Sequence, residues 1–237
     1  MTGEALVITC EHGGREVPAA YAPLFVAHQA LLQTHRGWDP GALELARQMA
    51  LAFDAPLFAA TTTRLLIDLN RSMGHRQLHS EATRNLALAT RRDIATQYYR
   101  PHRDKVELEA ARLMAAGRRV VHVASHSFTP ELNGIVRRAD VAWLYDPRRT
   151  GETALAAQWQ SALRQRRPEL KLRRNYPYEG KGDGLTSLLR QRHAPEQYVG
   201  IELEVNQRFV MQGGQAWTAL RADIIEALAD VLALTRP

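Results

Sequence analysis

Short apolar runs that end in polar or charged residues recur along this chain of 237 residues. The runs are rich in Val, Ile and Leu, and they lie at residues 5–10, 64–69, 119–124, 141–145 and 198–205. Continuous apolar runs of this length are typical of strands that are covered on both faces of a sheet. The pattern therefore predicts a buried sheet built from these segments.

Helical periodicity fills the segments between the predicted strands. Asp39 and Pro40 supply an N-cap residue and a proline at the first helical position of the first helix. Pro101 falls inside the second helical segment, where a proline kinks a helix or starts a new one. Helices are expected over residues 41–53, 91–116, 150–165 and 215–234.

The alternation of strands and helices predicts an α/β fold with a mostly parallel central sheet and helices on both faces. Residues 70–90 and 174–194 are expected to form loops, and the second of these is long and polar enough to be a lid or substrate loop. The sequence shows no internal repeat or low-complexity linker, so we expect residues 1–237 to form a single domain.

Composition narrows the classes of function. The net charge of +6 comes from 31 Lys and Arg against 25 Asp and Glu. The arginines are spread along the chain and no nucleic-acid-binding motif is present, so a small anionic substrate is a better expectation than a nucleic acid. The single Cys10 excludes an intrachain disulfide, and residues 1–9 lack the pattern of a secretory signal. With no apolar run near the ~18 residues of a membrane span, we expect a cytoplasmic protein without membrane contact.

The ends of the predicted strands carry the candidate chemistry. His12 follows the first strand and precedes two glycines, and His126 follows the third strand. Ligands bind open α/β sheets beyond the carboxyl ends of the strands. Two histidines and one carboxylate are the protein ligands of many catalytic zinc sites, which keep a fourth position for water. The pattern predicts one Zn²⁺ per chain.

The residues alone do not determine the third metal ligand. Asp39 is favoured, although capping of the following helix also explains it. Glu16 is an alternative on a predicted loop, whereas Glu11 would point away from His12 if the strand continues. His122 lies on the same strand face as His126, and a role in the core is favoured for it.

Glu202 and Glu204 share one face of the last strand. An acid in an apolar strand is costly unless it is paired or functional, and a Glu beside a metal-bound water is suited to act as general base. We therefore expect one of the two in the site and the other paired with Arg or at its rim.

Arg64, Asn70 and Arg71 flank the predicted strand 64–69. A guanidinium group binds a carboxylate through two parallel hydrogen bonds, which predicts a site for a substrate carboxylate. Asp68 is expected to orient one of these arginines or to help hold the site. A surface cluster of salt bridges is the alternative.

Taken in order, the motifs resemble the N-formylglutamate amidohydrolase family over residues 7 to about 208. They are EHGGREVP, HRGWDPG, RLLIDLNRS, YYRPH, ASHSFTP, NYPYEGKGDG and VGIELEVNQ. The resemblance implies a zinc-dependent hydrolase of amide bonds, with a mixed sheet between helices like that of zinc exopeptidases, aspartoacylases and N-acetylmuramoyl amidases.

The resemblance also implies residue roles. It assigns the metal ligands to His12, Asp39 and His126, and it favours Glu202 over Glu204 as the base. Asn70 and Arg71 match a carboxylate-binding segment, with Arg64 nearby. The chain departs from the aspartoacylase pattern in having Arg15 where a ligand three residues after His12 is expected. His102, Tyr178 and Asp183 also fall in family-like motifs.

The expected reaction is hydrolysis of a small N-acyl amino acid, with N-formylglutamate giving formate and glutamate. The alternatives are a zinc amidase that acts on another acyl amino acid or a peptidoglycan fragment, and a binding module of the same fold that has lost catalysis. The sequence does not determine the oligomeric state.

Overall fold

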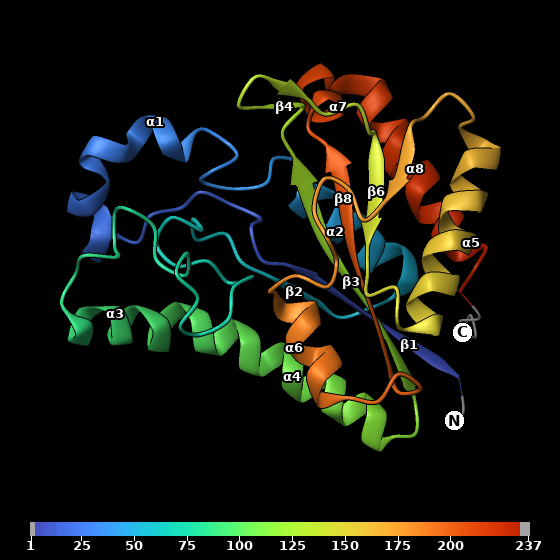
Figure 1. The fold of residues 1–237 in the computed structure, drawn as a ribbon, viewed down its shortest axis with the longest axis horizontal. Helices are drawn as coiled ribbons and strands as arrows, with labels where there is room; N and C mark the ends of the chain where they lie inside the picture. The colour runs from blue at the N-terminus through green and yellow to red at the C-terminus, as the bar shows by residue number, and fades with distance from the viewer. Residues whose placement is uncertain (1–2, 233–237) are drawn as a thin grey trace.

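A six-stranded mixed sheet forms the centre of the computed structural model, which describes residues 3–232 (Figure 1). The strand order is β2-β1-β3-β8-β6-β7. β2, β1, β3 and β8 run parallel, β6 is antiparallel to β8, and β7 is parallel to β6. The strands are β1 (Glu4–Cys10), β2 (Leu57–Ala59), β3 (Arg119–Phe128), β6 (Val141–Leu144), β7 (Leu172–Arg174) and β8 (Tyr198–Asn206). A separate short hairpin joins β4 (Glu131–Leu132) and β5 (Ile135–Val136).

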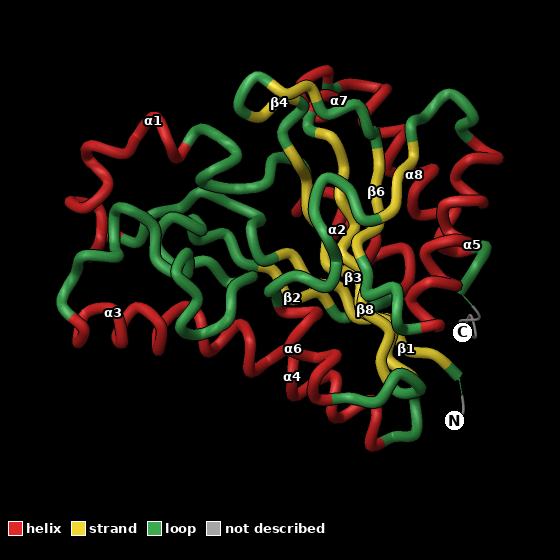
Figure 2. Tube along the Cα trace, viewed as in Figure 1, coloured by secondary structure: helices red, strands yellow, loops and turns green. Residues whose placement is uncertain are grey.

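Helices cover both faces of this sheet, as Figure 2 shows in red against the yellow strands. On one face lie α2 (Ala42–Phe53), α5 (Thr150–Arg166) and α8 (Gly214–Ala229), whose apolar residues share a large core with the sheet. On the other face lie α4 (Arg100–Ala115) and α6 (Leu185–Arg192). The short α7 (Arg208–Gln212) precedes α8. The α/β fold with a mostly parallel sheet and helices on both faces is confirmed.

Period-two alternation assigns each strand residue to one of these faces. In β1, Ile8 belongs to the core under α2, whereas the adjacent Val7 packs with Val106 of α4. β8 alternates in the same way, with Ile201 in the large core and Tyr198 against α4 and α6. The face that carries α4 and α6 therefore also carries the even-numbered polar residues of β3 and β8.

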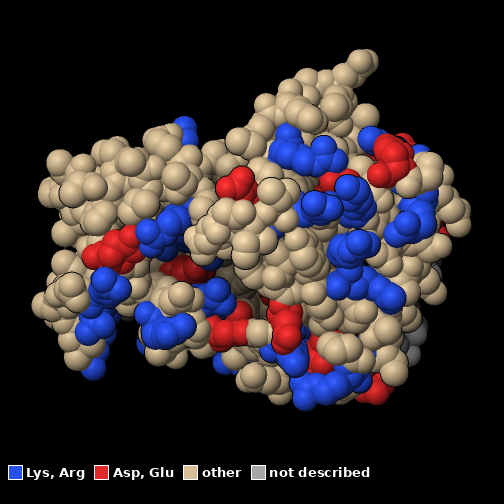
Figure 3. All heavy atoms as spheres, turned by 45° about the horizontal axis from the view of Figure 1, so that its top comes forward, with Lys and Arg blue, Asp and Glu red and all other residues tan. Residues whose placement is uncertain are grey.

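A second apolar core lies beside the sheet, in residues 17–36 and 60–99, which we call the side lobe (left in Figure 1). It contains the 3-10 helix η1 (Ala19–His28), α1 (Gln29–Leu32), α3 (Leu88–Ile94) and the π-helical turn η2 (Ala95–Tyr99). Phe25, Leu66 and Ile94 are fully buried in it. Basic and acidic side chains are interspersed over the lobe and over the sheet region (Figure 3).

Four of the predicted strands are present, and the predicted strand at 64–69 is wrong. Residues 64–69 form turns, and their apolar side chains fill the core of the side lobe instead of a sheet. A short apolar run occurs in buried turns as well as in buried strands, and the periodicity of so few residues does not distinguish the two structures. The three-residue strands β2 and β7 carried too little pattern to be predicted.

The predicted helices over 41–53 and 150–165 are confirmed almost to the residue, and 215–234 is confirmed up to Ala229, with residues 233–234 outside the described part. The segment 91–116 starts earlier and consists of α3, η2 and α4, with Pro101 in the first turn of α4. The loop expected at 174–194 is wrong over Leu185–Arg192, which form α6. None of the described helices is long and apolar enough to span a bilayer.

Candidate metal centre and active-site cavity

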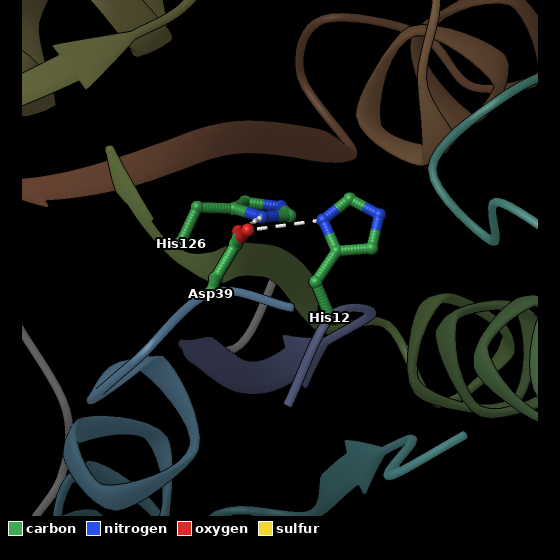
Figure 4. Close-up of side chains that lie close together, drawn as sticks. All are labelled: His12, Asp39 and His126. Carbon is green, nitrogen blue, oxygen red and sulfur yellow. Dashed lines mark hydrogen bonds and ion pairs between the residues drawn. The ribbon is translucent and has the colours of Figure 1, made fainter. Parts of the chain in front are cut away.

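Three buried side chains converge at the carboxyl end of the sheet: His12, Asp39 and His126 (Figure 4). His12 follows β1, His126 lies near the end of β3, and Asp39 precedes α2. A backbone hydrogen bond of 2.9 Å from Asp39 N to His12 O fixes the two segments to each other. A Cβ on Gly14 would lie 2.4 Å from the Thr61 carbonyl oxygen, so the turn after His12 requires glycine.

The role of Asp39 as a helix N-cap is wrong. The N-cap residue of α2 is Gly41, in a left-handed conformation with φ 80°, and the helix has no side-chain cap. The Asp39 carboxylate is therefore free to face the histidines. Its Oδ2 lies 3.3 Å from His12 Nδ1 and 2.9 Å from His126 Nδ1.

This donor set fits a metal ion. Nδ1 of both rings faces the same carboxylate oxygen, and the candidate ligand atoms all lie within 4.8 Å of one another. Two ligands that are each roughly 2.0–2.1 Å from a tetrahedral zinc lie about 3.4 Å apart, close to the separations from Asp39.

The opposite nitrogen of each ring faces a second carboxylate. His12 Nε2 lies 2.7 Å from Asp68 Oδ1, and His126 Nε2 lies 3.1 Å from Glu11 Oε2. A hydrogen bond from Nε2 to a carboxylate fixes the ring so that the Nδ1 lone pair is available to a metal. Asp68 therefore holds His12 through a hydrogen bond, and Glu11 faces His126 as an ion pair, with Nδ1 of each ring toward Asp39.

Glu11 was not predicted to belong to the site. It does point away from His12, as the strand pattern indicates, but this direction places it against His126 and His102. It is completely buried, and His102 Nε2 lies 3.6 Å from its other oxygen. Burial by itself raises the pKa of Glu11, but the adjacent imidazoles of His102 and His126 outweigh it and hold this pKa well below its usual range. The signal in the sequence was an acid at the end of an apolar strand.

Arg64 links the two carboxylates beside His12. Its guanidinium donates to Asp68 Oδ2 at 2.7 and 3.2 Å and to Asp39 Oδ1 at 3.3 Å. Burial by itself raises the pKa of Asp68. The charges of Arg64 and His12 outweigh burial and hold this pKa well below its usual range, so the carboxyl group stays ionised. Asp68 therefore pairs with Arg64, which is one of its two expected contacts.

These residues open onto a cavity of about 370 Å³. Its wall includes the predicted residues Arg64, Asn70, Arg71, Tyr178, Asp183, Glu202 and Glu204 together with His12, Asp39 and His126. The loop before α6 supplies Tyr178 and Asp183, and Arg71 Nη1 donates to the Asp183 carbonyl oxygen at 3.1 Å. A volume of this size suits a small molecule.

Glu202 and Glu204 both line the cavity but have different surroundings. Glu202 is half-buried and accepts a hydrogen bond of 2.6 Å from Thr186 Oγ1 of α6. Glu204 is buried beside His126 in the sheet register, and its Oε2 has no partner among the described residues. Burial raises the pKa of Glu204 to about 8.

The remaining predicted residues lie outside the cavity wall. Glu16 accepts a hydrogen bond of 2.7 Å from Thr61 Oγ1 at the surface. His102 lies behind Glu11. His122 is a core residue, bonded to Thr9 Oγ1 at 2.9 Å and Tyr198 Oη at 2.7 Å, and burial lowers its pKa to about 4.

The model of the N-formylglutamate amidohydrolase family matches residues 4–211. The chain belongs to this family. The family assignment covers the whole sheet and every candidate site residue named above. As a member of an amidohydrolase family, the protein is a hydrolase, and its His-Asp-His group is consistent with a metal site.

Two solved structures have the same fold. Gene product Atu2144 from Agrobacterium tumefaciens is 28% identical with a TM-score of 0.81, over 97% of this chain and 90% of that one. The N-formylglutamate amidohydrolase from Ralstonia eutropha JMP134 is 21% identical with a TM-score of 0.73, over 97% and 94% of the two chains. No curated protein sequence is similar enough to count as a match.

Proposed function

We propose that this protein is a zinc-dependent amidohydrolase that cleaves N-formylglutamate to formate and glutamate. The single observation that carries the proposal is the convergence of His12, Asp39 and His126 in a family member whose cavity wall also holds Glu202, Glu204 and two arginines. A bound zinc would lower the pKa of its water from 15.7 to about 7 and polarise the formyl oxygen.

The protein's own residues would do the remaining work. Glu202 is proposed as the base that accepts a proton from the attacking water, and Thr186 holds its carboxylate in place. Glu204 has a pKa of about 8 and is suited to deliver a proton to the leaving nitrogen. A carboxyl group whose pKa is raised by its surroundings can hold a proton and act as the general acid.

The substrate carboxylates are proposed to bind at the Asn70–Arg71 side of the cavity. Asn70 Oδ1 accepts from the Leu185 backbone N–H at 2.8 Å, so the amide is fixed with its NH₂ group as the free donor. Arg71 Nε is buried without a partner among the described residues. Arg64 is engaged by Asp39 and Asp68, so we propose that it supports the metal ligands and binds substrate only through its remaining exposed edge.

The experiment that tests this proposal is formate release from N-formylglutamate, with N-acetylglutamate and N-succinylglutamate as alternative substrates. The proposal predicts the highest kcat/KM for the formyl compound. A preference for another acyl group would support the proposed hydrolase activity but would show that N-formylglutamate is not the preferred substrate. Absence of hydrolysis with all three compounds in zinc-loaded protein would refute the proposal.

A further inference from the structure

A second cavity, of about 530 Å³, lies in the side lobe and is lined by arginines. The turns at 73–84 form one wall, and one face of the helix that runs from α3 through η2 into α4 forms the other. Its basic residues are Arg76, Arg84, Arg91, Arg92 and Arg100, and we call it the arginine cavity.

No carboxylate lines the arginine cavity, and none of its five arginines forms an ion pair within residues 3–232. Arg91 Nε is buried and has no hydrogen-bond partner in the described part of the chain. Other arginines of the chain, such as Arg36 and Arg208, do find carboxylates. Several guanidinium groups gathered without a counter-charge repel one another, and an anionic ligand relieves this repulsion.

A bridging cavity of about 350 Å³ shares wall residues with both the arginine cavity and the metal cavity, and its two carboxylates, Asp68 and Glu81, are ion-paired with Arg64 and Arg36. It shares Arg64, Arg71 and Tyr178 with the wall of the metal cavity. It shares Arg76 and Arg84 with the arginine cavity. Arg71 and Arg76 are five residues apart in the chain, so their Cα atoms lie at most roughly 18 Å from each other. A peptide of about five extended residues covers the same span.

We propose that the arginine cavity binds the acidic extension of a longer substrate, an N-acylated peptide with several carboxylates, whose acyl amide bond lies at the metal centre. Each carboxylate along the extension is a bidentate partner for a guanidinium group. The continuity of the walls favours an extended chain over a separate small anion. The hydrolysis of this longer substrate rests on the proposed function, whereas anion binding in the arginine cavity does not depend on it.

The test compares N-formyl oligoglutamates of one to five residues with peptides of equal length in which glutamine replaces every glutamate after the first. The proposal predicts that kcat/KM rises about tenfold or more along the glutamate series and stays flat along the glutamine series. The rise should shrink at high salt, because exposed ion pairs are screened. A flat glutamate series, in protein that hydrolyses N-formylglutamate, would overturn the proposal.

A double variant, Arg84→Gln with Arg91→Gln, locates the effect. It should lower kcat/KM for the five-residue glutamate peptide to that of the glutamine peptide and leave N-formylglutamate hydrolysis unchanged. Arg164→Gln is the control for loss of an arginine elsewhere, because Arg164 is exposed on α5 across the sheet and forms no ion pair in residues 3–232. An unchanged preference in the double variant would contradict the assignment to this cavity.

A binding measurement separates failure of this proposal from failure of the proposed function. If the protein hydrolyses no formyl compound, calorimetric titration with unmodified pentaglutamate still tests the arginine cavity. Binding that the double variant loses and the Arg164→Gln variant keeps supports the cavity as an oligocarboxylate site. Absence of binding to the parent protein overturns it.

Discussion

Replacing Glu11 with glutamine tests whether the carboxylate behind His126 supports metal binding. The change keeps the shape of the side chain and removes one negative charge at a completely buried position. Glutamine can still place its carbonyl oxygen near His126 Nε2, now 3.1 Å from the carboxylate, but only as a neutral acceptor. The second contact, at 3.6 Å from His102, loses its charge in the same way.

The size of the effect follows from the contact between Glu11 and His126 Nε2, which loses its charge and keeps a neutral acceptor. A hydrogen bond to a charged group contributes about 1.5–3 kcal/mol, and a neutral one about 0.5–1.5 kcal/mol. The difference of roughly 1–1.5 kcal/mol corresponds to about tenfold in a binding constant. This lies at the lower end of the ~10–100-fold loss that is typical when a partner of a metal-binding histidine is removed.

The assay is competition for zinc between the metal-free protein and a chromophoric chelator at fixed pH. Glu16→Gln is the matched control, because Glu16 lies five residues away, loses the same charge and contacts Thr61 outside the cavity. We expect zinc affinity to fall about tenfold in Glu11→Gln and to stay unchanged in Glu16→Gln. Urea denaturation of both metal-free variants shows whether the fold is retained. Unchanged zinc affinity in a folded Glu11→Gln variant would refute the reasoning.

Three further predictions concern the cavity. His126→Ala should abolish zinc binding and formate release together, since it removes one of three ligands; a folded variant that keeps both would contradict the metal centre. Glu202→Gln should lower kcat by about 10²–10⁴-fold with zinc content unchanged, if it is the base, and unaltered kcat would move that role elsewhere. The third is Glu204→Gln, which should make the metal-free protein more stable than the parent, by a margin that grows as the pH rises from 5 to 8. The pKa of Glu204 is raised to about 8 in the fold, so the native state binds a proton that the unfolded state has lost, and parent stability falls as pH rises through this window. Urea denaturation from pH 5 to 8 measures this, and parallel curves for the two proteins would contradict it.

Much of the central sheet could be predicted because long apolar strands leave a strong pattern. β1, β3, β6 and β8 are buried on both faces and read as continuous apolar runs. The error at 64–69 has the same origin, because Leu66 and Ile67 are equally buried in the side lobe. An apolar run indicates that a segment is buried, and it indicates a strand only when the run is long enough. The helix α6 was missed because its eight residues follow a glycine-rich loop and carry few apolar side chains.

The His-Asp-His group could be foreseen in part from the sequence, but the residues that surround it could not. His12 and His126 stand out because a histidine after an apolar strand is unusual. Asp39 was uncertain because its position also suited a helix cap, and only the cap geometry at Gly41 removes this alternative. The contact between Glu11 and His126 depends on the parallel register of β1 and β3, which pairs Thr9 with Ala124. Register between distant parallel strands leaves no trace in a single sequence.

The central claim is that catalysis depends on one zinc ion held by His12, Asp39 and His126. Its most direct test is to add zinc stepwise to the metal-free protein and to measure formate release from N-formylglutamate at each step. Activity should rise in proportion to zinc and saturate at one ion per chain. Full activity before any zinc is added, or no activity once one ion is bound, would contradict it.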